Sequence, residues 1–337
     1  MDEAGEHNAA TQKDGLAAQA ADEAGKTITE GLLKHIPQIV ESCGATALFV
    51  YVDALEDPGQ DLWPSMKAKV FRVTKGQSCG ADSESPHCLR VPDVPMTRIG
   101  RVKIAVFLAL SRGLVKRKDR IVFLSGLAAS KTLDTVIVTE VGQEYEIFST
   151  GMDLGEGVPP VLPEVIERIV DIASELGSEG REGKGVGAMF IVGDIDRVIP
   201  LTRQLVLNPF KGYLPSERNI LNCSLEETVK ELATLDGAFI IRSDGVIETC
   251  GAYVRTASQE EFELPRGLGA RHHAAAAITA VTDSLAITVS ESTGSVTIFR
   301  AGRIITEIEK PRSTGQKQML SLVRDRNAGQ YSPGLQS

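Results

Sequence analysis

The chain has 337 residues, a formal net charge of −9 and 24% charged residues. At about 100 to 200 residues per domain this length predicts two domains, and the composition excludes wholesale disorder. No apolar run approaches the roughly 20 residues of a membrane span, and the acidic, polar first residues are unlike a secretory signal. We therefore expect a cytoplasmic protein without a membrane partner. Since no whole-surface basic field is available, we also expect no binding to DNA.

The cysteine pattern favours reduced thiols over a disulfide framework, because five cysteines are scattered along a long chain. One cluster, Cys79 with His87 and Cys88, lacks the second pair of ligands at regular spacing that a zinc site needs. We interpret residues 76–95 as a polar loop.

The first part of the chain predicts a disordered arm followed by an α/β domain. Residues 1–26 carry almost no large apolar side chain and so cannot offset their ordering entropy. Helical and strand patterns then alternate, which predicts an open α/β sheet for residues 27–154. The expected helices are 28–43, interrupted by Pro37, and 100–113, and the expected strands are 45–54, 121–126 and 135–141.

Residues 120–142 resemble the carboxy-terminal domain of pyruvate kinases, in which a strand ending in Ser-Gly precedes a loop and a second strand. Ser125 and Gly126 hold the matching places. The resemblance implies a small-molecule effector, of the phosphorylated kind, at this amino-terminal domain. The alternative is a glycine needed only to leave the strand.

A glycine- and proline-rich link near residue 155 marks a domain boundary, so we expect a second domain over residues 155–310 and a tail over 311–337. Residues 161–177 predict an amphipathic helix stopped by Gly177. Ser224 and Glu227 predict a capping box that opens the next helix. The other expected elements are a strand at 185–194, a helix or turn at 196–210, the helix 225–235, and a hairpin at 239–252 that turns at 243–245.

Three motifs in the second domain carry residue types suited to a nucleotide. Asp236-Gly237-Ala238 places a carboxylate beside two residues of minimal bulk at a helix-to-strand junction. Gly267-Leu268-Gly269 feeds a helix that begins Ala270-Arg271-His272-His273, where amide donors and basic groups favour an anion. Ser290-Glu291-Ser292-Thr293-Gly294 offers hydroxyls and an acid at a strand end. Each motif taken alone could be an ordinary turn.

In this order and spacing the motifs resemble the diadenylate cyclase (DAC) family, over about residues 160–307. The layout is similar to the soluble archaeal-type form with a pyruvate-kinase C-terminal-like domain in front. The resemblance implies a mixed, twisted sheet surrounded by helices. It also implies condensation of two ATP into cyclic di-AMP, dependent on Mn²⁺ or Mg²⁺, in a homo-oligomer whose DAC domains meet face to face.

The resemblance also implies roles for individual residues. Asp236, Arg271 and His272 would be catalytic, with Asp236 and Glu291 as metal ligands. The nucleotide would be held by Gly237, Ala238, Gly267, Leu268, Gly269, Ala270, His273, Ser290 and Thr293.

Two residues depart from the family motif Thr-Arg-His-Arg, because Ala270 replaces the threonine and His273 the final arginine. An unperturbed histidine is mostly neutral at pH 7, so the triphosphate is less well neutralised than by arginine. The alternative function is therefore a catalytically weakened protein that binds or senses a nucleotide or cyclic di-AMP.

Overall fold

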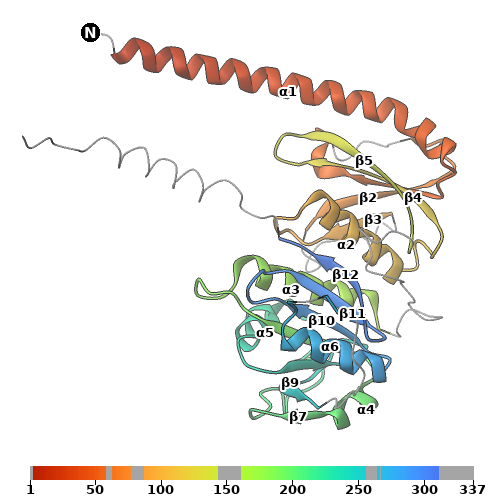
Figure 1. Cartoon of the computed structure of the whole chain (residues 1–337), viewed down its shortest axis with the longest axis vertical. Coiled ribbons are helices and arrows are strands. Elements are labelled where there is room, and N and C mark those ends of the chain that lie inside the picture. The colour runs from red at the N-terminus through yellow and green to blue at the C-terminus, as the bar shows by residue number, and fades with distance from the viewer. Residues whose placement is uncertain are drawn as a thin grey trace, which may run out of the picture.

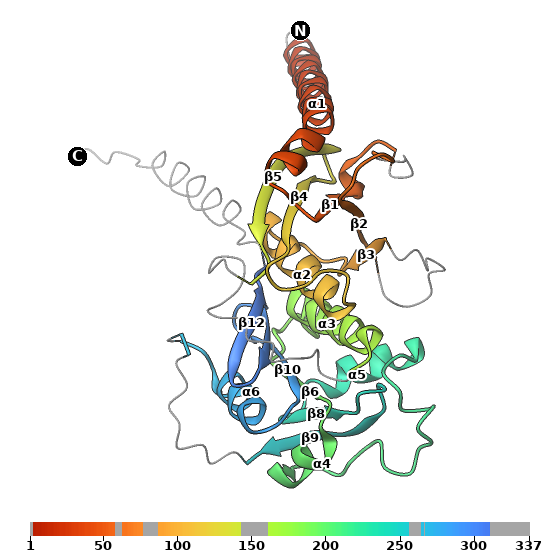
Figure 2. The same cartoon turned by 90° about the vertical axis from the view of Figure 1, so that its right-hand side faces the viewer.

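A computed structural model describes residues 3–57, 63–76, 87–142, 161–255, 264–265 and 267–310, with side chains from residue 23 onward, Leu127 excepted. Two sheets follow one another along the long axis of the molecule (Figures 1 and 2). Their strand orders are β3-β2-β1-β4-β5 and β12-β11-β10-β6-β8-β9-β7. This confirms an α/β fold in two successive parts. The predicted boundary near residue 155 and the tail 311–337 lie outside the described residues.

The described helices are α1 (Glu3–Ser42), α2 (Arg98–Ser111), α3 (Pro163–Glu179), α4 (Ile195–Val198), α5 (Glu226–Leu232) and α6 (Ala270–Val281). The strands of the first sheet are β1 (Ala47–Tyr51), β2 (Lys69–Lys75), β3 (Cys88–Val91), β4 (Arg120–Leu127) and β5 (Thr132–Glu140). The strands of the second sheet are β6 (Ala188–Val192), β7 (Thr202–Gln204), β8 (Ala238–Ile241), β9 (Ile247–Val254), β10 (Leu285–Val289), β11 (Val296–Arg300) and β12 (Arg303–Ile308).

The first sheet is parallel except at one edge. β1 pairs in parallel with β2 and β4, and β2 with β3, whereas β5 runs antiparallel to β4. The central strand β1 is buried along its whole length, as its unbroken apolar run predicts. The polar-loop prediction is wrong at its carboxyl end, since Cys88 opens β3. Half-exposed edge strands of this kind show little apolar patterning in the sequence.

The amino-terminal arm is helical in the structure, so the expected disorder over residues 1–26 is corrected. α1 runs without a break from Glu3 to Ser42 and includes Pro37. Its first half is rich in Ala, which has the highest helix propensity of all residues even where no apolar face exists. The later turns pack on the first sheet, where the Leu133 amide donates to Thr29 Oγ1 at 3.0 Å.

The second sheet has two covered faces, because alternate side chains of a strand point to opposite sides. Ala188, Phe190 and Val192 of β6 share a core with α3. Met189 and Ile191 of the same strand share a core with α6. Apart from the parallel pair β6–β8, the described strand pairs of this sheet are antiparallel. The expected mixed sheet between helices is confirmed.

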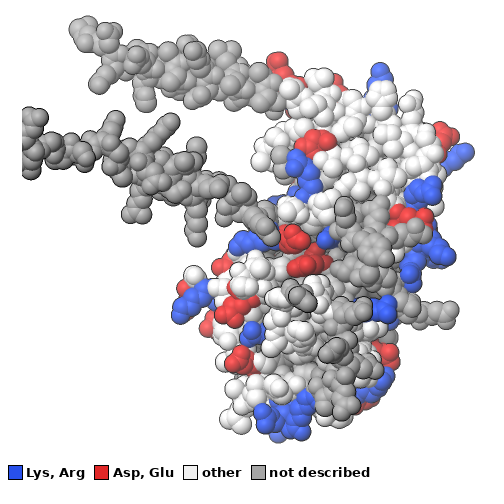
Figure 3. Space-filling model, viewed as in Figure 1, with Lys and Arg blue, Asp and Glu red and all other residues white. Residues whose placement is uncertain are grey.

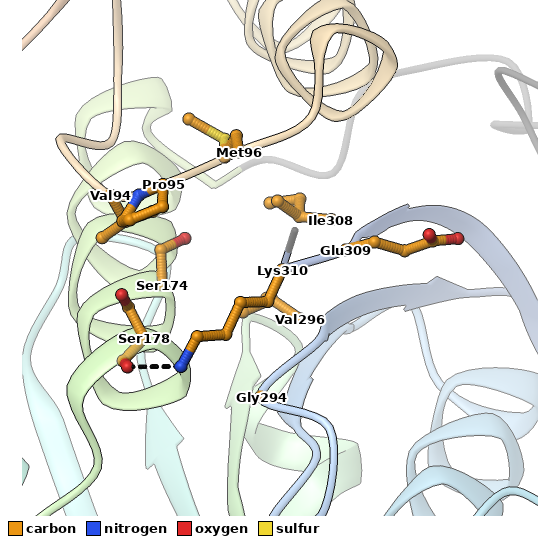
Figure 4. A pocket seen from close by; sticks show the side chains of 10 residues that line it. All are labelled: Val94, Pro95, Met96, Ser174, Ser178, Gly294, Val296, Ile308, Glu309 and Lys310. Atoms are coloured by element: carbon orange, nitrogen blue, oxygen red, sulfur yellow. Dashed lines mark hydrogen bonds between the residues drawn. The ribbon is translucent and has the colours of Figure 1, made fainter. Parts of the chain in front are cut away.

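The two sheets share one apolar core. α2 contacts both α3 and β12, and the buried side chains of the first sheet are continuous with those on the α3 face of the second. A bidentate ion pair reinforces this contact, because Arg112 Nε and Nη2 donate to Glu167 at 2.5 and 2.7 Å. Figure 4 shows a hollow in the contact, lined by residues of both parts, in which Lys310 Nζ donates to Ser178 O at 2.7 Å.

Three local expectations for the second part are corrected by the structure. Gly177 lies inside α3, and the residue that ends the helix is Gly180, with φ +65°. A 3-10 turn, Cys223–Leu225, precedes α5 and is capped by Asn222, whose side chain accepts from the Ser224 amide. The N-cap of α5 itself is Leu225, which makes no side-chain cap bond, so Ser224 is not the capping residue. Cys223 is disulfide-bonded, although Cys43, Cys88 and Cys250 are free thiols. Disulfide pairing depends on proximity in space, which spacing along the chain does not show.

Charges of both signs are interspersed on the face drawn in Figure 3, with neutral residues between them. Within the described part of the chain, no helix combines the length and the apolar character needed to cross a bilayer.

Candidate active site

The amino terminus of α6 presents backbone donors at a glycine-rich turn. Gly267 has φ +95°, a left-handed conformation that other residues rarely adopt. Gly269 is the N-cap and offers no side chain to accept from the first turn. The His272 and His273 amides donate to Gly269 O at 3.0 and 3.3 Å. The Ala270 and Arg271 amides, for which no acceptor is found among the described residues, keep capacity for an outside acceptor, and the helix dipole favours a negatively charged one. The sequence interpretation of this turn as a helix start is confirmed.

The loop after β10 is fixed by its own hydrogen bonds. The Gly294 amide donates to Ser290 O at 2.8 Å, and the Ser290 amide donates to Ser295 O at 2.9 Å. The Thr293 and Ser295 hydroxyls lie 2.9 Å apart, and the Thr293 amide donates to Ser290 Oγ at 3.4 Å. These contacts hold the backbone of residues 290–294 in one shape while Glu291 stays exposed.

Glycines on α3 and before β6 let other segments approach this loop. A Cβ at Gly177 would overlap Gly294 O, and one at Gly185 would overlap Glu291 O. A Cβ at Gly187 would lie 2.5 Å from Arg271 Nη1. The sequence interpretation missed these residues. Two glycines spaced by two directly before a buried strand were the signal for them.

These segments enclose an open hollow of about 740 Å³. Its lining includes these predicted residues: Gly267, Leu268, Gly269, Ala270, Arg271, His272, Ser290, Glu291 and Thr293. Lining residues that the sequence interpretation did not name are Lys184, Gly185, Val289, Ser295 and Glu307. A smaller hollow of about 310 Å³ adjoins it on the α3 side of the 290–294 loop. Two of the three predicted motifs thus meet in one place.

The third motif joins them through an ion-pair bridge. Arg271 Nη2 lies 3.1 Å from Asp236 Oδ1, and Arg271 Nη1 lies 3.7 Å from Glu291 Oε2. The Asp236 side chain is 90% exposed, whereas that of Arg271 is 29% exposed. One guanidinium therefore contacts two carboxylates that stand 55 residues apart in the sequence, and both carboxylates remain largely exposed to solvent.

The neighbours of Asp236 are placed by packing. Gly237 has φ +107°, and a Cβ there would lie 2.6 Å from the Gly251 carbonyl carbon on β9. Ala238 is fully buried at the start of β8 and shares a core with α6. Neither they nor Asp236 are among the residues that line the 740 Å³ hollow. The small side chains set the path of the backbone that carries the carboxylate.

The two histidines differ in environment. His272 is 5% exposed and meets the Phe299 ring edge-on, with centroids 6.0 Å apart. Its Nε2 has no hydrogen-bond partner among the described residues. Burial, and then the charge of His273, lowers the pKa of His272 below its ordinary value. His272 is thus kept neutral beside the hollow, while His273 is exposed and does not line it.

The residues present fit a divalent cation that is shared with a ligand. No group of three or more His, Cys, Asp or Glu side chains suited to a metal occurs in the described ranges. Asp236 and Glu291 nevertheless converge on a single cationic group, that of Arg271. Mg²⁺ is commonly held by one or two carboxylates, with substrate phosphates and water as further ligands.

Ser125 and Gly126, the other predicted ligand residues, lie inside the first sheet. Ser125 is fully buried, and a Cβ at Gly126 would overlap Thr132 O on β5. Arg101 Nη1 donates to Ser125 Oγ at 3.3 Å and to Gly126 O at 3.0 Å, and its Cζ lies 3.8 Å from the Tyr51 ring centroid. The glycine is needed for the close approach of two strands. A ligand could reach Ser125 only after this packing had opened.

Comparison with known proteins places the same part of the chain in context. Residues 175–304 match the family model described as DAC, DisA bacterial checkpoint controller nucleotide-binding. A diadenylate cyclase of Methanocaldococcus jannaschii is 37% identical over 212 residues, which is 61% of this chain and 64% of that protein. A diadenylate cyclase of Haloferax volcanii is 43% identical over 148 residues, which is 44% of this chain and 53% of that protein.

A solved structure of DacA from Staphylococcus aureus aligns with 19% identity and a TM-score of 0.29, over 48% of this chain and 94% of that one. The alignments span less than two thirds of the length of the two curated relatives. The matched residues 175–304 contain the three motifs and the Arg271 bridge. This chain therefore carries a region similar to the DAC nucleotide-binding family, and that region is the candidate active site.

Proposed function

We propose that the chain is a diadenylate cyclase that condenses two ATP into cyclic di-AMP and two pyrophosphates. One observation carries the proposal: Asp236, Arg271 and Glu291 converge beside an open hollow at a helix amino terminus. Curated diadenylate cyclases at 37% and 43% identity support it.

The reaction makes two phosphodiester bonds. In each half, a ribose 3′-oxygen attacks the α-phosphorus of the other ATP, the bond between that phosphorus and pyrophosphate breaks, and the hydroxyl proton passes to solvent water. Such a transfer depends on positioning the groups and on stabilising negative charge. We assign Asp236 to the reacting hydroxyl, Arg271 to the α-phosphate, and the α6 amides with Ser290 and Thr293 to the phosphate chain.

A divalent cation, Mn²⁺ or Mg²⁺, would be held by Asp236 and Glu291 together with the phosphates. When bound, it supplies positive charge to the phosphates and orients them. Arg271 would then exchange its carboxylate partners for a phosphate, since a guanidinium forms equally suitable bonds with either.

We propose that two copies act together. A hollow of about 740 Å³ is within the size range, roughly 300–1,000 Å³, of a site for one small ligand, whereas the product contains two nucleotides. The exposed carboxylate of Asp236 is therefore available to a nucleotide on a second copy. Apolar side chains close to Asp236 support a contact between two copies. Val206 and the Asp236 backbone both adjoin Gly251, and the next residue, Leu207, is 96% exposed.

The test is incubation of the full chain with ATP and Mn²⁺ over a range of protein concentrations, with mass detection of the product. We expect cyclic di-AMP and a rate that rises more steeply than linearly with concentration. Asp236→Asn should abolish the product with an unchanged unfolding midpoint. Leu207→Asp should lower the product at dilute protein and reduce the mass seen by light scattering. Absence of product at every concentration contradicts the proposal.

A second function, a catalytically weakened nucleotide-binding or sensor protein, is favoured by one observation. Arg271 is already paired with two carboxylates. The residue before the Arg271-His272 pair is Ala270, and the residue after it is His273. Tight binding of ATP without product, in wild type and in His273→Arg alike, would favour the sensor.

A further inference from the structure

We infer that Lys184 is the cation that recognises the β- and γ-phosphates of the substrate, and with them the leaving pyrophosphate. This inference rests on the proposed function and adds a residue that neither the sequence motifs nor the comparisons assign. Lys184 lies in the turn between α3 and β6, outside all three motifs.

The backbone of Lys184 is fixed by a tight turn. The amide of Arg181 donates to Lys184 O, and the amide of Lys184 donates to Arg181 O, both at 2.9 Å. Between them, Glu182 and Gly183 have φ +49° and +75°, the left-handed pair typical of a type I′ turn. A Cβ at Gly180 would overlap Lys184 O, so this glycine permits the close return of the chain. The lysine therefore starts from a defined point.

Lys184 borders both hollows. Lys184 and the loop residues 290–293 line the 740 Å³ hollow and the adjoining 310 Å³ hollow alike. Lys184 thus stands where the larger hollow, at the α6 amino terminus, passes into the smaller one. A chain of phosphates that begins near Arg271 and follows the loop leads to it.

Lys184 differs from the basic residues nearby in the partners of its charged group. Arg271 is engaged by Asp236 and Glu291. Arg181, at the start of the same turn, pairs with Glu227 and Glu231. Lys310 donates to a backbone carbonyl. In the part of the chain that the structure describes, no hydrogen bond or ion pair of the Lys184 ammonium is found, and the residue is exposed.

Spacing along the segment that leads into β6 indicates which phosphates Lys184 would meet. Gly187 lies against Arg271, and Gly185 lies against Glu291 O. Lys184 precedes Gly187 by three residues, which in an extended chain is about 10 Å. Two cations separated along one loop match a ligand whose negative charge is spread over its length. A triphosphate has that property and a monophosphate does not.

The experiment compares ATP with AMP by titration calorimetry on the full chain, with and without Mn²⁺. The variants are Lys184→Met, which keeps the aliphatic stem, Lys184→Arg, which keeps the charge, and Lys211→Met, an exposed lysine that lines neither hollow. We expect Lys184→Met to lower the affinity for ATP about ten- to hundredfold, which is the scale of a lost charge-assisted contact. Its affinity for AMP should stay within about twofold. Lys184→Arg should recover most of the loss, and Lys211→Met should resemble wild type.

The outcomes separate this inference from the proposed function. The assignment of Lys184 is overturned if Lys184→Met binds ATP with the affinity of wild type. It is also overturned if the affinity for AMP falls as much as the affinity for ATP. Both conclusions hold even where cyclic di-AMP is made. If the wild type makes no cyclic di-AMP yet Lys184→Met selectively loses ATP, the proposed function fails and the polyphosphate site stands. A wild type that binds no ATP overturns both.

Discussion

Two arginine clusters, one beside each sheet, use the same side chain for different purposes. Arg101 of α2 packs against the first sheet, 5% exposed, stacked on Tyr51 and bonded to Ser125 and Gly126. Arg271 lies in the first turn of α6, with 29% of its side chain exposed, between two carboxylates that face solvent. Both clusters contain a serine or an acid that the sequence marks as a candidate ligand. Burial decides between them, because only the second is open to a ligand as folded.

The largest expected effect is at the open cluster. Arg271→Met removes the positive group that we assign to the reacting phosphate, and we expect the rate of cyclic di-AMP formation to fall by at least about a hundredfold. The unfolding midpoint should hardly change, since exposed ion pairs contribute about 0–1 kcal/mol. A steady-state assay and a thermal melt check this.

The matched control is Arg242→Met, which removes another exposed arginine paired with an aspartate, Asp244, at 2.6 Å. It should leave the rate of cyclic di-AMP formation near that of wild type. Equal losses of rate in both variants would remove the distinction between Arg271 and an ordinary surface arginine.

The buried cluster should respond in the opposite way. Arg101→Met leaves Ser125 and the Gly126 carbonyl without their donor, and we expect a loss of about 2 kcal/mol of unfolding free energy in denaturant titrations. The rate per folded molecule should be unchanged. Arg98→Met, on the same helix as Arg101, breaks a more exposed pair with Asp134 of β5 and should cost less than about 1 kcal/mol. A rate loss in Arg101→Met at full folding would mean that the first sheet takes part in catalysis.

A smaller effect tests how the open cluster is held. In Gly187→Ala the new Cβ would lie 2.5 Å from Arg271 Nη1 and 3.3 Å from Glu291 Cβ. The flexible guanidinium can move, so we expect little loss of stability but a rate lower by about tenfold, because small misplacements of catalytic groups are costly. Gly31→Ala, where nothing lies within 4 Å, should leave the rate intact. An unaltered rate in Gly187→Ala would show that Arg271 needs no fixed position.

The smallest effect concerns pH. The folded protein lowers the pKa of His272, chiefly by burial, so below the ordinary histidine pKa of about 6.5 the unfolded chain binds more protons than the folded one. Stability should therefore decrease as pH falls from about 7.5 through this range. His272→Phe should flatten the dependence of the unfolding midpoint on pH, and His273→Phe should leave most of it. Identical slopes in the two variants would contradict the assignment to His272.

The comparison also shows what the sequence could and could not predict. The buried strand β1, the helix α2 and the hairpin of β8 and β9 follow from apolar periodicity and a glycine turn. The helix start at Ala270 was predictable from its glycine-rich approach. These features depend on residues close together in the chain.

Features that depend on residues far apart in the chain could not be predicted from the sequence. Ser125 carries the same chemical groups whether buried or exposed, and only the position of Arg101 shows that it is enclosed. Gly177 resembles a helix stop, yet its lack of a side chain serves the approach of Gly294. Lys184 resembles any surface lysine until the turn places it between two hollows.

The apolar core shared by the two sheets affects how the protein unfolds. Removing residues 161–310 from the rest would expose the apolar face of α3 and β12 that α2 now covers, and it would leave the carboxylate of Glu167 without Arg112. Neither sheet has a closed surface of its own along this contact. On heating, the two sheets should therefore melt in one cooperative step, and a ligand at either sheet should raise the melting temperature of both.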